Sequence, residues 1–155
     1  MRNTVIFDFD GTIANTFPIV EIIAQDIARR NGFEISTREA RSIGLQQVLK
    51  KARFPKYKIP QTLLEVKRRL GLKIRDEVAP FHDMDRVLFS LSQKYDLGIV
   101  SSNSESNIKN FLEKHHFLDY FNYIHSDSSL FGKHAVLRRF CRKYKVKAAD
   151  LTFIG

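Results

Sequence analysis

The hydrophobic pattern in the first half of the chain predicts one strand followed by several helices. Residues 3–9 are rich in β-branched and aromatic residues, which is typical of a buried strand. After Pro18, isoleucines recur at helical spacing from Ile19 to Ile27, and no strand pattern returns before residue 75. The predicted helices run from Thr16 to about Gly32, from Ser36 to about Gly44, from Leu45 to Phe54, and from Gln61 to Leu70 with Gly71 behind it.

The second half of the chain, from Pro80 onward, alternates between helical and strand patterns. Its most apolar run, Leu97–Val100, is typical of a strand covered on both faces. Strands that alternate with helices predict an α/β fold with a parallel sheet and right-handed crossovers. The predicted elements are a helix over Met84–Tyr95, a strand over Leu97–Val100, a helix from Ser104 to Lys114, a strand over Tyr123–His125, a helix over Ala135–Tyr144 and a strand over Leu151–Ile154.

These two patterns predict two domains, and the distribution of charge separates the same regions. Residues 1–15 and 79–155 form the expected α/β core, and residues 16–78 form an all-helical insertion. Residues 28–75 contain 14 Lys/Arg and 3 Asp/Glu, whereas the rest of the chain contains 12 Lys/Arg and 14 Asp/Glu. This segment therefore suits a small anionic substrate, although solvated basic helix faces would show the same composition.

Composition narrows the class of protein further. The 155 residues are 43% hydrophobic, which is enough for a substantial core, and no run approaches the length of a membrane span. Cys141 is the only cysteine, so an internal disulfide is impossible and a reducing compartment is expected. The N-terminus lacks the pattern of a signal peptide. We therefore expect a soluble cytoplasmic protein with no membrane partner.

Polar residues gather where two predicted parallel strands end. Asp8 and Asp10 close the first strand, and residues 101–103 follow the second. In an open parallel sheet, ligands bind beyond the carboxyl ends of the strands. Residues two apart in a strand share a side, so the two carboxylates can face one reacting centre, and Gly11 permits a sharp turn behind them. The sequence thus predicts a site at this rim.

Four motifs in this order resemble the haloacid dehalogenase-like superfamily, and within it the phosphoglycolate phosphatase-like members with a helical cap. They are "DFDGT" at 8–12, "IVSSN" at 99–103, "FGK" at 131–133 and "DLTFIG" at 150–155. The resemblance covers essentially the whole chain. It implies a Rossmann-like, three-layer core with a parallel sheet and an inserted helical cap. It also implies a Mg²⁺-dependent phosphatase that acts on a small phosphorylated metabolite through an aspartyl-phosphate.

The resemblance also implies a role for each motif residue. Asp8 matches the nucleophile, and Asp10 matches the general acid and base. The implied Mg²⁺ would be held by the Asp8 side chain and the Asp10 main-chain carbonyl, which are hard oxygen ligands. The residues expected to bind the phosphate, beside their local roles in the turn and at the helix start, are Thr12, Ser101, Ser102 through its N–H, Asn103 and Lys133.

The sequence departs from the family at its end and leaves other functions open. The chain stops at Gly155, before the acids of the family's fourth motif, so we expect either a longer natural chain or impaired catalysis. A phosphomutase of the β-phosphoglucomutase type would share the first motif. A non-catalytic regulatory protein that binds an anionic partner is a third reading. Nucleic acid is the least favoured partner, because stacking aromatics are not interleaved with the basic residues.

Overall fold

The computed structural model describes residues 2–36, 45–127 and 132–155, and of Arg75, Gly132 and Lys133 it describes the main chain. The chain divides into two compact units. The core unit comprises Met1–Asn15 and Ala79–Gly155, and the helical unit comprises Thr16–Val78. The predicted helix from Ser36 to about Gly44 falls on residues 37–44, outside the described residues.

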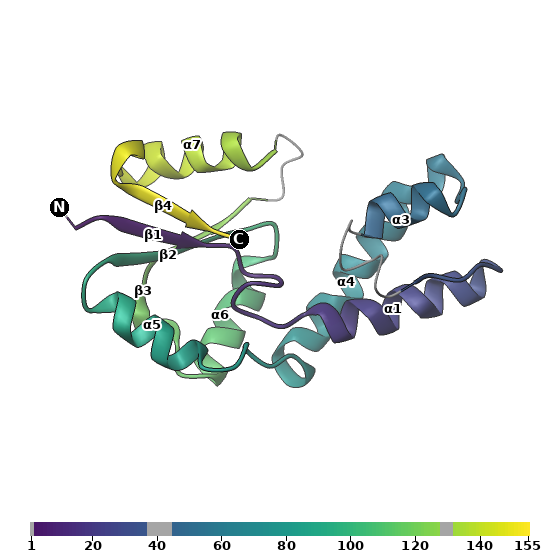
Figure 1. The fold of residues 1–155 in the computed structure, drawn as a ribbon, viewed down its shortest axis with the longest axis horizontal. Helices are drawn as coiled ribbons and strands as arrows, with labels where there is room; N and C mark the ends of the chain where they lie inside the picture. The colour runs from purple at the N-terminus through teal and green to yellow at the C-terminus, as the bar shows by residue number, and fades with distance from the viewer. Residues whose placement is uncertain (1, 37–44, 128–131) are drawn as a thin grey trace. The chain divides into compact units, whose positions relative to one another are not determined.

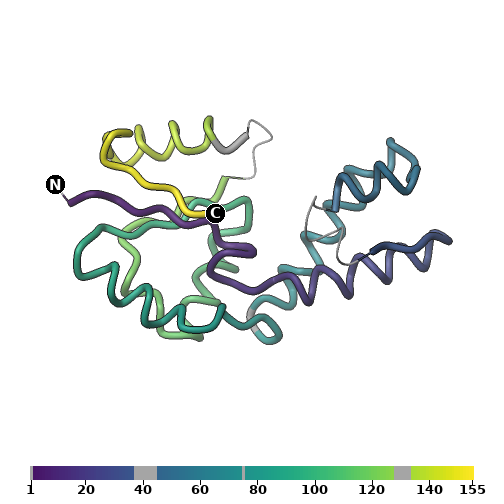
Figure 2. The backbone as a smooth tube through the Cα atoms, viewed as in Figure 1, coloured from purple at the N-terminus to yellow at the C-terminus, as the bar shows by residue number. Residues whose placement is uncertain are grey.

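A sheet of four parallel strands, in the order β3-β2-β1-β4, organises the core unit (Figure 1). The strands are β1 (Thr4–Phe7), β2 (Asp96–Ser101), β3 (Phe121–Ser126) and β4 (Leu151–Ile154). Although β1 and β4 come from opposite ends of the chain, they run side by side (Figure 2). Phe7 lies opposite Ile99 of β2 and Ile154 of β4. The predicted parallel α/β architecture is confirmed.

Helices cover both faces of this sheet (Figure 1). On one face α7 (Gly132–Tyr144) contributes Val136 and Phe140, which pack in a buried cluster with Ile6 of β1 and Val100 of β2. On the other face lie α5 (Met84–Ser92) and α6 (Glu105–Lys114). Short 3₁₀ turns at η2 (Leu118–Tyr120) and η3 (Ala148–Asp150) lead into β3 and β4. Burial on both faces explains the continuous apolar runs in β1 and β2.

The helical unit contains α1 (Phe17–Arg30), α3 (Leu45–Lys51), the 3₁₀ turn η1 (Lys56–Lys58) and α4 (Ile59–Glu77). Leu49, Phe54 and Ile59 form a small buried cluster between its elements. On the surface, α1 and α4 are joined by ion pairs between two acids and two arginines. Among the described residues, no helix is long and apolar enough to cross a membrane.

The helix predicted over Gln61–Leu70 corresponds to α4. Its predicted end at Leu70 was wrong, because α4 continues through Gly71 to Glu77. A glycine inside a helix costs about 1 kcal/mol relative to alanine. The residues beyond it offset that cost, because Ile74 and Val78 are buried and an isoleucine side chain contributes about 1.5–3 kcal/mol when fully buried. Packing in the folded unit therefore outweighs the local signal to stop.

Candidate functional site

The site is built on the turn that follows β1. The N–H of Asp8 donates to the carbonyl of Ile154 (2.9 Å), which extends the β1–β4 ladder by one residue. Phe9 is completely buried and packs edge-on against Phe111 of α6, with ring centroids 5.2 Å apart. The buried ring anchors the chain between the two acids. Asp8 and Asp10 are both partly exposed on either side of it.

The backbone reverses immediately after Asp10. Gly11 has a φ of 77°, a conformation that L side chains rarely adopt, and its N–H donates to the carbonyl of Ala14 (2.9 Å). The carbonyl of Phe9 accepts N–H bonds from Thr12, Ile13 and Ala14, at 3.3, 3.1 and 3.0 Å. The sharp turn that the sequence predicted at Gly11 is therefore present. Thr12 lies inside it, partly buried.

Gly155 lies directly beside Asp8. It follows β4 directly, with a φ of 151°. A Cβ atom at this position would lie 2.6 Å from the Cβ of Asp8, a separation that real side chains do not show. A glycine is thus needed here for Asp8 to occupy its observed position.

Ser101 and Asn103 bring the end of β2 to the same rim. Both are buried, with 4% and 5% of their surface exposed, whereas Ser102 between them is exposed. The N–H of Asn103 donates to Oγ of Ser101 (3.1 Å). Because Ser101 Oγ accepts this bond through a lone pair, its hydroxyl hydrogen can still be donated to another group.

A side-chain contact joins the two strand ends. Nδ2 of Asn103 lies 3.2 Å from Oδ2 and 3.4 Å from Oδ1 of Asp10, and donates to this carboxylate. The two residues are 93 positions apart in sequence. The structure therefore brings Asp10 and Asn103, which the sequence predicted at one rim, into direct contact.

Three further residues that were not predicted as site residues hold Asn103 in place. Oδ1 of Asn103 accepts bonds from the N–H of Ser104 (2.9 Å) and from Nδ2 of Asn107 (3.0 Å). Its carbonyl accepts a bond from Oγ of Ser126 at the end of β3 (2.5 Å). Asn107 lies one helical turn after Asn103, which was a usable signal, but Ser126 reaches the site only through strand pairing.

The third predicted motif is described only in part. Lys133 lies in the first turn of α7, and its side chain is outside the described residues, as is Phe131 of the same motif. The observed contacts therefore concern the first, second and fourth motifs. The role of Lys133 stays a prediction.

The donors available to a metal are oxygen atoms. The Asp8 carboxylate and the Asp10 main-chain carbonyl are hard ligands of the kind that Mg²⁺ prefers, and this ion is commonly held by one or two carboxylates with waters and substrate phosphate. Over residues 2–36, 45–127 and 132–155, no group of three or more His, Cys, Asp or Glu is arranged to hold a metal. The donor set fits Mg²⁺ and does not suit a closed site for a softer metal.

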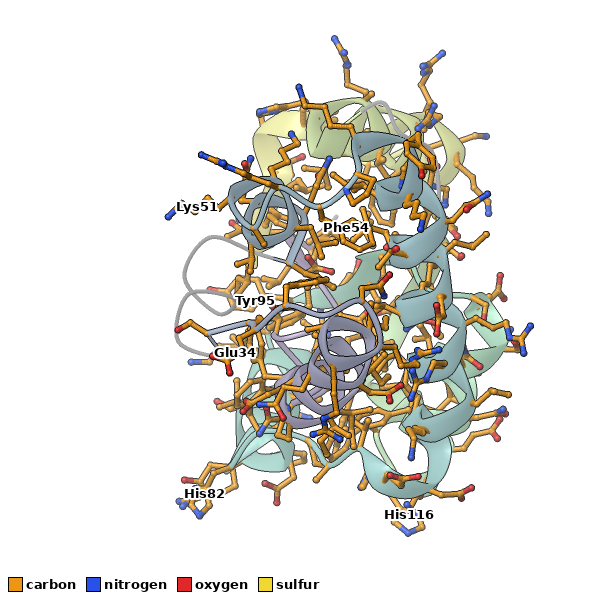
Figure 3. The ribbon with its side chains drawn as sticks, turned by 90° about the vertical axis from the view of Figure 1, so that its right-hand side faces the viewer. Glu34, Lys51, Phe54, His82, Tyr95 and His116 are labelled. Atoms are coloured by element: carbon orange, nitrogen blue, oxygen red, sulfur yellow. The ribbon has the colours of Figure 1, made fainter. Side chains whose placement is uncertain are left out.

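The histidines outside the motifs differ in their environments. His82 and His116 project away from the chain (Figure 3), as expected for surface residues. His125 in β3 is largely buried beside Phe140 and Tyr144, and its ring nitrogens have no hydrogen-bond partner among the described residues. Burial, with Lys143 nearby, lowers the pKa of His125 below its ordinary value of 6.5.

Comparison with known proteins places this architecture in a family. Residues 5–155 match the family described as haloacid dehalogenase-like hydrolase. A phosphoglycolate phosphatase from Synechococcus elongatus is 27% identical over 156 residues, which span 97% of this chain and 73% of that protein.

Solved structures show the same fold. A hydrolase of the haloacid dehalogenase-like family from Streptococcus pneumoniae has a TM-score of 0.81 at 18% identity, over 99% of this chain and 75% of that one. A predicted phosphatase from Clostridium acetobutylicum has a TM-score of 0.80 at 19% identity, over 100% and 76% of the two chains. At these identities the likeness concerns the fold.

Proposed function

This chain belongs to the haloacid dehalogenase-like hydrolase family, and from that premise we propose that it hydrolyses the phosphate monoester of a small metabolite. The proposal rests on one observation: the Asp10 carboxylate contacts the amide of Asn103 at the end of β2, close in sequence to Asp8 and Ser101 respectively. The similarity to a phosphoglycolate phosphatase supports a small phosphorylated acid or sugar as the substrate class.

The first step transfers the phosphoryl group to Asp8. A carboxylate oxygen of Asp8 forms a bond to phosphorus while the bond from phosphorus to the ester oxygen breaks. Asp10 donates its proton to the departing oxygen, so the leaving group departs as an alcohol. The two carboxyl groups suit these separate tasks, because they follow one strand two residues apart and the Asp10 carboxylate accepts from the amide of Asn103.

The second step releases phosphate. Asp10, now a carboxylate, accepts a proton from a water molecule as the water oxygen attacks the phosphorus of the aspartyl-phosphate. The bond from phosphorus to Asp8 breaks, which yields inorganic phosphate and the original Asp8 carboxylate. The same residue thus acts first as an acid and then as a base.

The phosphate oxygens need donors and positive charge during both steps. We assign the Ser101 hydroxyl, the Ser102 N–H, Thr12 and the Lys133 side chain to this task. The assignment of Ser101 is supported by its place at the end of β2 and by the hydroxyl hydrogen that its bond with Asn103 leaves available. A cation such as Lys133 would offset the negative charges of phosphate and Asp8 together.

A magnesium ion is the cofactor that we propose, held by the Asp8 carboxylate and the Asp10 carbonyl. When bound, it supplies positive charge to the phosphate oxygens. Asp8 is also held by its neighbours, because the N–H of Phe9 donates to its Oδ1 (2.8 Å). The protein therefore contributes the position of the nucleophile, whatever share of the charge the ion provides.

We further propose that the helical unit acts as a cap that sets the substrate preference. It is inserted directly after the turn that carries Asp10, between Asn15 and Ala79. Residues 28–75 carry the excess positive charge of the chain, which suits an anionic substrate. A cap of this kind would exclude water from the reacting groups when it closes.

The proposal is tested with a panel of phosphomonoesters, assayed with and without Mg²⁺. We expect release of inorganic phosphate that requires Mg²⁺ and is lost in the variant Asp8→Asn. Asp119→Asn is a matched control, because Asp119 is an exposed acid of the same unit. An Asp8→Asn variant as active as the parent would contradict the proposal, and isomerised sugar phosphate in place of free phosphate would indicate a mutase.

A further inference from the structure

We propose that Asn103 is a positioning residue for Asp10, and that it does not bind the phosphate. This inference rests on the proposed function, because it assigns a partner to the proposed general acid. It concerns one contact in the core unit, between the amide of Asn103 and the carboxylate of Asp10. The family resemblance implies that Asn103 binds the phosphate, but its contacts favour a different role.

The orientation of the Asn103 amide follows from its neighbours. The backbone N–H of Ser104 can only donate a hydrogen bond, and it lies 2.9 Å from the side-chain oxygen of Asn103. That atom must therefore be the oxygen, and the NH₂ group must face Asp10. Asn107 adds a second bond to the same oxygen (3.0 Å). The start of α6 thus determines that the NH₂ end of the amide faces Asp10.

All polar groups of Asn103 are engaged inside the protein. Its N–H donates to Ser101 and its carbonyl accepts from Ser126. Its side-chain oxygen accepts two bonds, and its NH₂ group lies within 3.4 Å of both carboxylate oxygens of Asp10. The Asp10 carboxylate takes one of the two hydrogens of the NH₂ group, and the inhibition constant of phosphate tests whether the other hydrogen reaches a phosphate oxygen.

Burial makes this arrangement hard to replace with water. Asn103 is only 5% exposed, and it is fixed from three sides by Ser101, Ser126 and the first turn of α6. Asp10, in contrast, sits at the start of a turn and is partly exposed. An amide held this firmly can restrict the carboxylate to one orientation, and the proton transfer depends on that orientation.

The experiment compares two aryl esters that differ in their need for a proton donor. Phenol has a pKa near 10, as tyrosine does, so phenyl phosphate needs Asp10 to protonate the leaving oxygen. Dinitrophenol is a far stronger acid and leaves without a proton. The measurement is kcat/KM for both esters with the full chain, together with the inhibition constant of inorganic phosphate, which reports phosphate binding.

For Asn103→Ala we expect kcat/KM to fall about 10- to 100-fold with phenyl phosphate and less than about 3-fold with dinitrophenyl phosphate. The inhibition constant of phosphate should change less than about 3-fold. Asn110→Ala is the matched control, because Asn110 is an exposed asparagine of α6. This variant should leave kcat/KM unchanged for both esters. Equal losses with both esters, together with weaker phosphate inhibition, would make Asn103 a phosphate ligand and overturn the inference.

A second variant guards against misfolding of the first. Asn107→Ala leaves Asn103 in place and removes one of the two bonds to its amide oxygen, so we expect a smaller loss that is still selective for phenyl phosphate. If either variant loses kcat/KM equally with phenyl phosphate and with dinitrophenyl phosphate, the positioning role is refuted. If the parent hydrolyses no ester, the proposed function fails and the inference falls with it, whereas an active parent with an unselective Asn103→Ala variant refutes the inference alone.

Discussion

The core unit and the helical unit hold their polar side chains in different ways. In the core unit, Asn103 is 5% exposed and bonded on every side, and through it the Asp10 carboxylate is tied to α6. In the helical unit, Asp26 accepts bonds from Arg69 (2.6 Å) and Arg30 (3.0 Å), with side chains that are 31–54% exposed. Both arrangements use strong donors and acceptors.

The two arrangements differ in what happens when one hydrogen-bonding partner is removed. Water cannot easily reach the buried amide of Asn103, so its removal leaves buried partners unsatisfied and takes away the group that orients the Asp10 carboxylate. An exposed ion pair is replaced by hydration at little cost. We conclude that the core unit is built to keep atoms in place, whereas the helical unit presents charge without fixing it closely.

The largest contrast is expected between two identical substitutions. Asp10→Asn should lower kcat/KM for phenyl phosphate about 100- to 10,000-fold, because the variant can neither donate nor accept the proton. Asp26→Asn should change it less than about 2-fold, because Asp26 pairs with Arg30 and Arg69 on the surface of the helical unit. Steady-state kinetics on both variants is the measurement. Similar losses in the two would erase the distinction between the units.

The next effect concerns packing in the helical unit. Phe54 is buried against Phe33, with centroids 5.4 Å apart, and Phe54→Ala should cost about 3–5 kcal/mol of unfolding free energy. Hydrogen exchange should accelerate in Thr16–Val78 and remain slow in the strands of the core unit. Phe89→Ala, at a residue that is 56% exposed, is the control. Faster exchange throughout the sheet would show that the two units unfold together.

A smaller effect is expected from Gly155→Ala. The added methyl group would lie 2.6 Å from the Cβ of Asp8, so we expect Asp8 to shift and kcat/KM to fall about 10-fold. Gly32→Ala in the helical unit is the matched control, since its φ of 72° is also positive but nothing lies within 4 Å of the added atom. It should lower stability by about 1 kcal/mol and leave kcat/KM unchanged. Full activity in Gly155→Ala would show that Asp8 tolerates displacement.

The pH dependence of stability offers a further distinction. Burial lowers the pKa of His125, so below pH 6.5 the unfolded chain takes up a proton that the folded chain resists. Folding stability should therefore fall as the pH drops from 7 through this range, opposed in part by Asp127 and Glu105 and reinforced by Lys143 and Arg139.

Denaturant titrations between about pH 7 and pH 5 measure this slope. His125→Phe, which packs with Phe140 and Tyr144 and cannot titrate, should flatten it. The exposed His82→Phe should leave it unchanged. A slope that survives in His125→Phe would assign the pH dependence to other groups.

The smallest effect is expected from the surface pairs. Hydrogen bonding from Arg69 lowers the pKa of Asp26 below its ordinary 3.8, so the contribution of this pair is present above that pH and is lost as the pH falls further. Salt near 1 M should remove the difference in melting temperature between the parent and Arg69→Ala, because the screening length is then about 3 Å. Arg68→Ala, an exposed arginine of α4, is the control. A loss that persists in high salt would indicate packing rather than charge.

Much of the fold could be predicted from local patterns. Hydrophobic periodicity located the strands and most helices, and the Ser104 cap was confirmed by its bond from the N–H of Asn107 (3.2 Å). The error at Gly71 has a plain cause. The glycine signal is local, whereas the burial of Ile74 that carries the helix onward exists only once α4 packs in the unit.

In the candidate site, too, some features could be predicted from local sequence and others could not. The turn at Gly11 was readable, because glycine chemistry acts over neighbouring residues. The strand predicted over residues 3–9 was too long, because β1 ends at Phe7 and strand alternation does not reach Asp8 and Asp10. The sequence also predicted that the ends of β1 and β2 share a rim. It did not predict which residues touch there, because the contacts of Asn103 with Asp10 and Ser126 depend on strand order and register.

The sequence by itself determined the alternation of elements, the family and the residue types available for phosphate chemistry. Tertiary structure alone decided that the amide of Asn103 faces Asp10 and that Gly155 leaves room for Asp8. The physical reason is range: backbone preferences are settled within a few residues, whereas a hydrogen bond across 93 positions exists only when the sheet has brought both partners together.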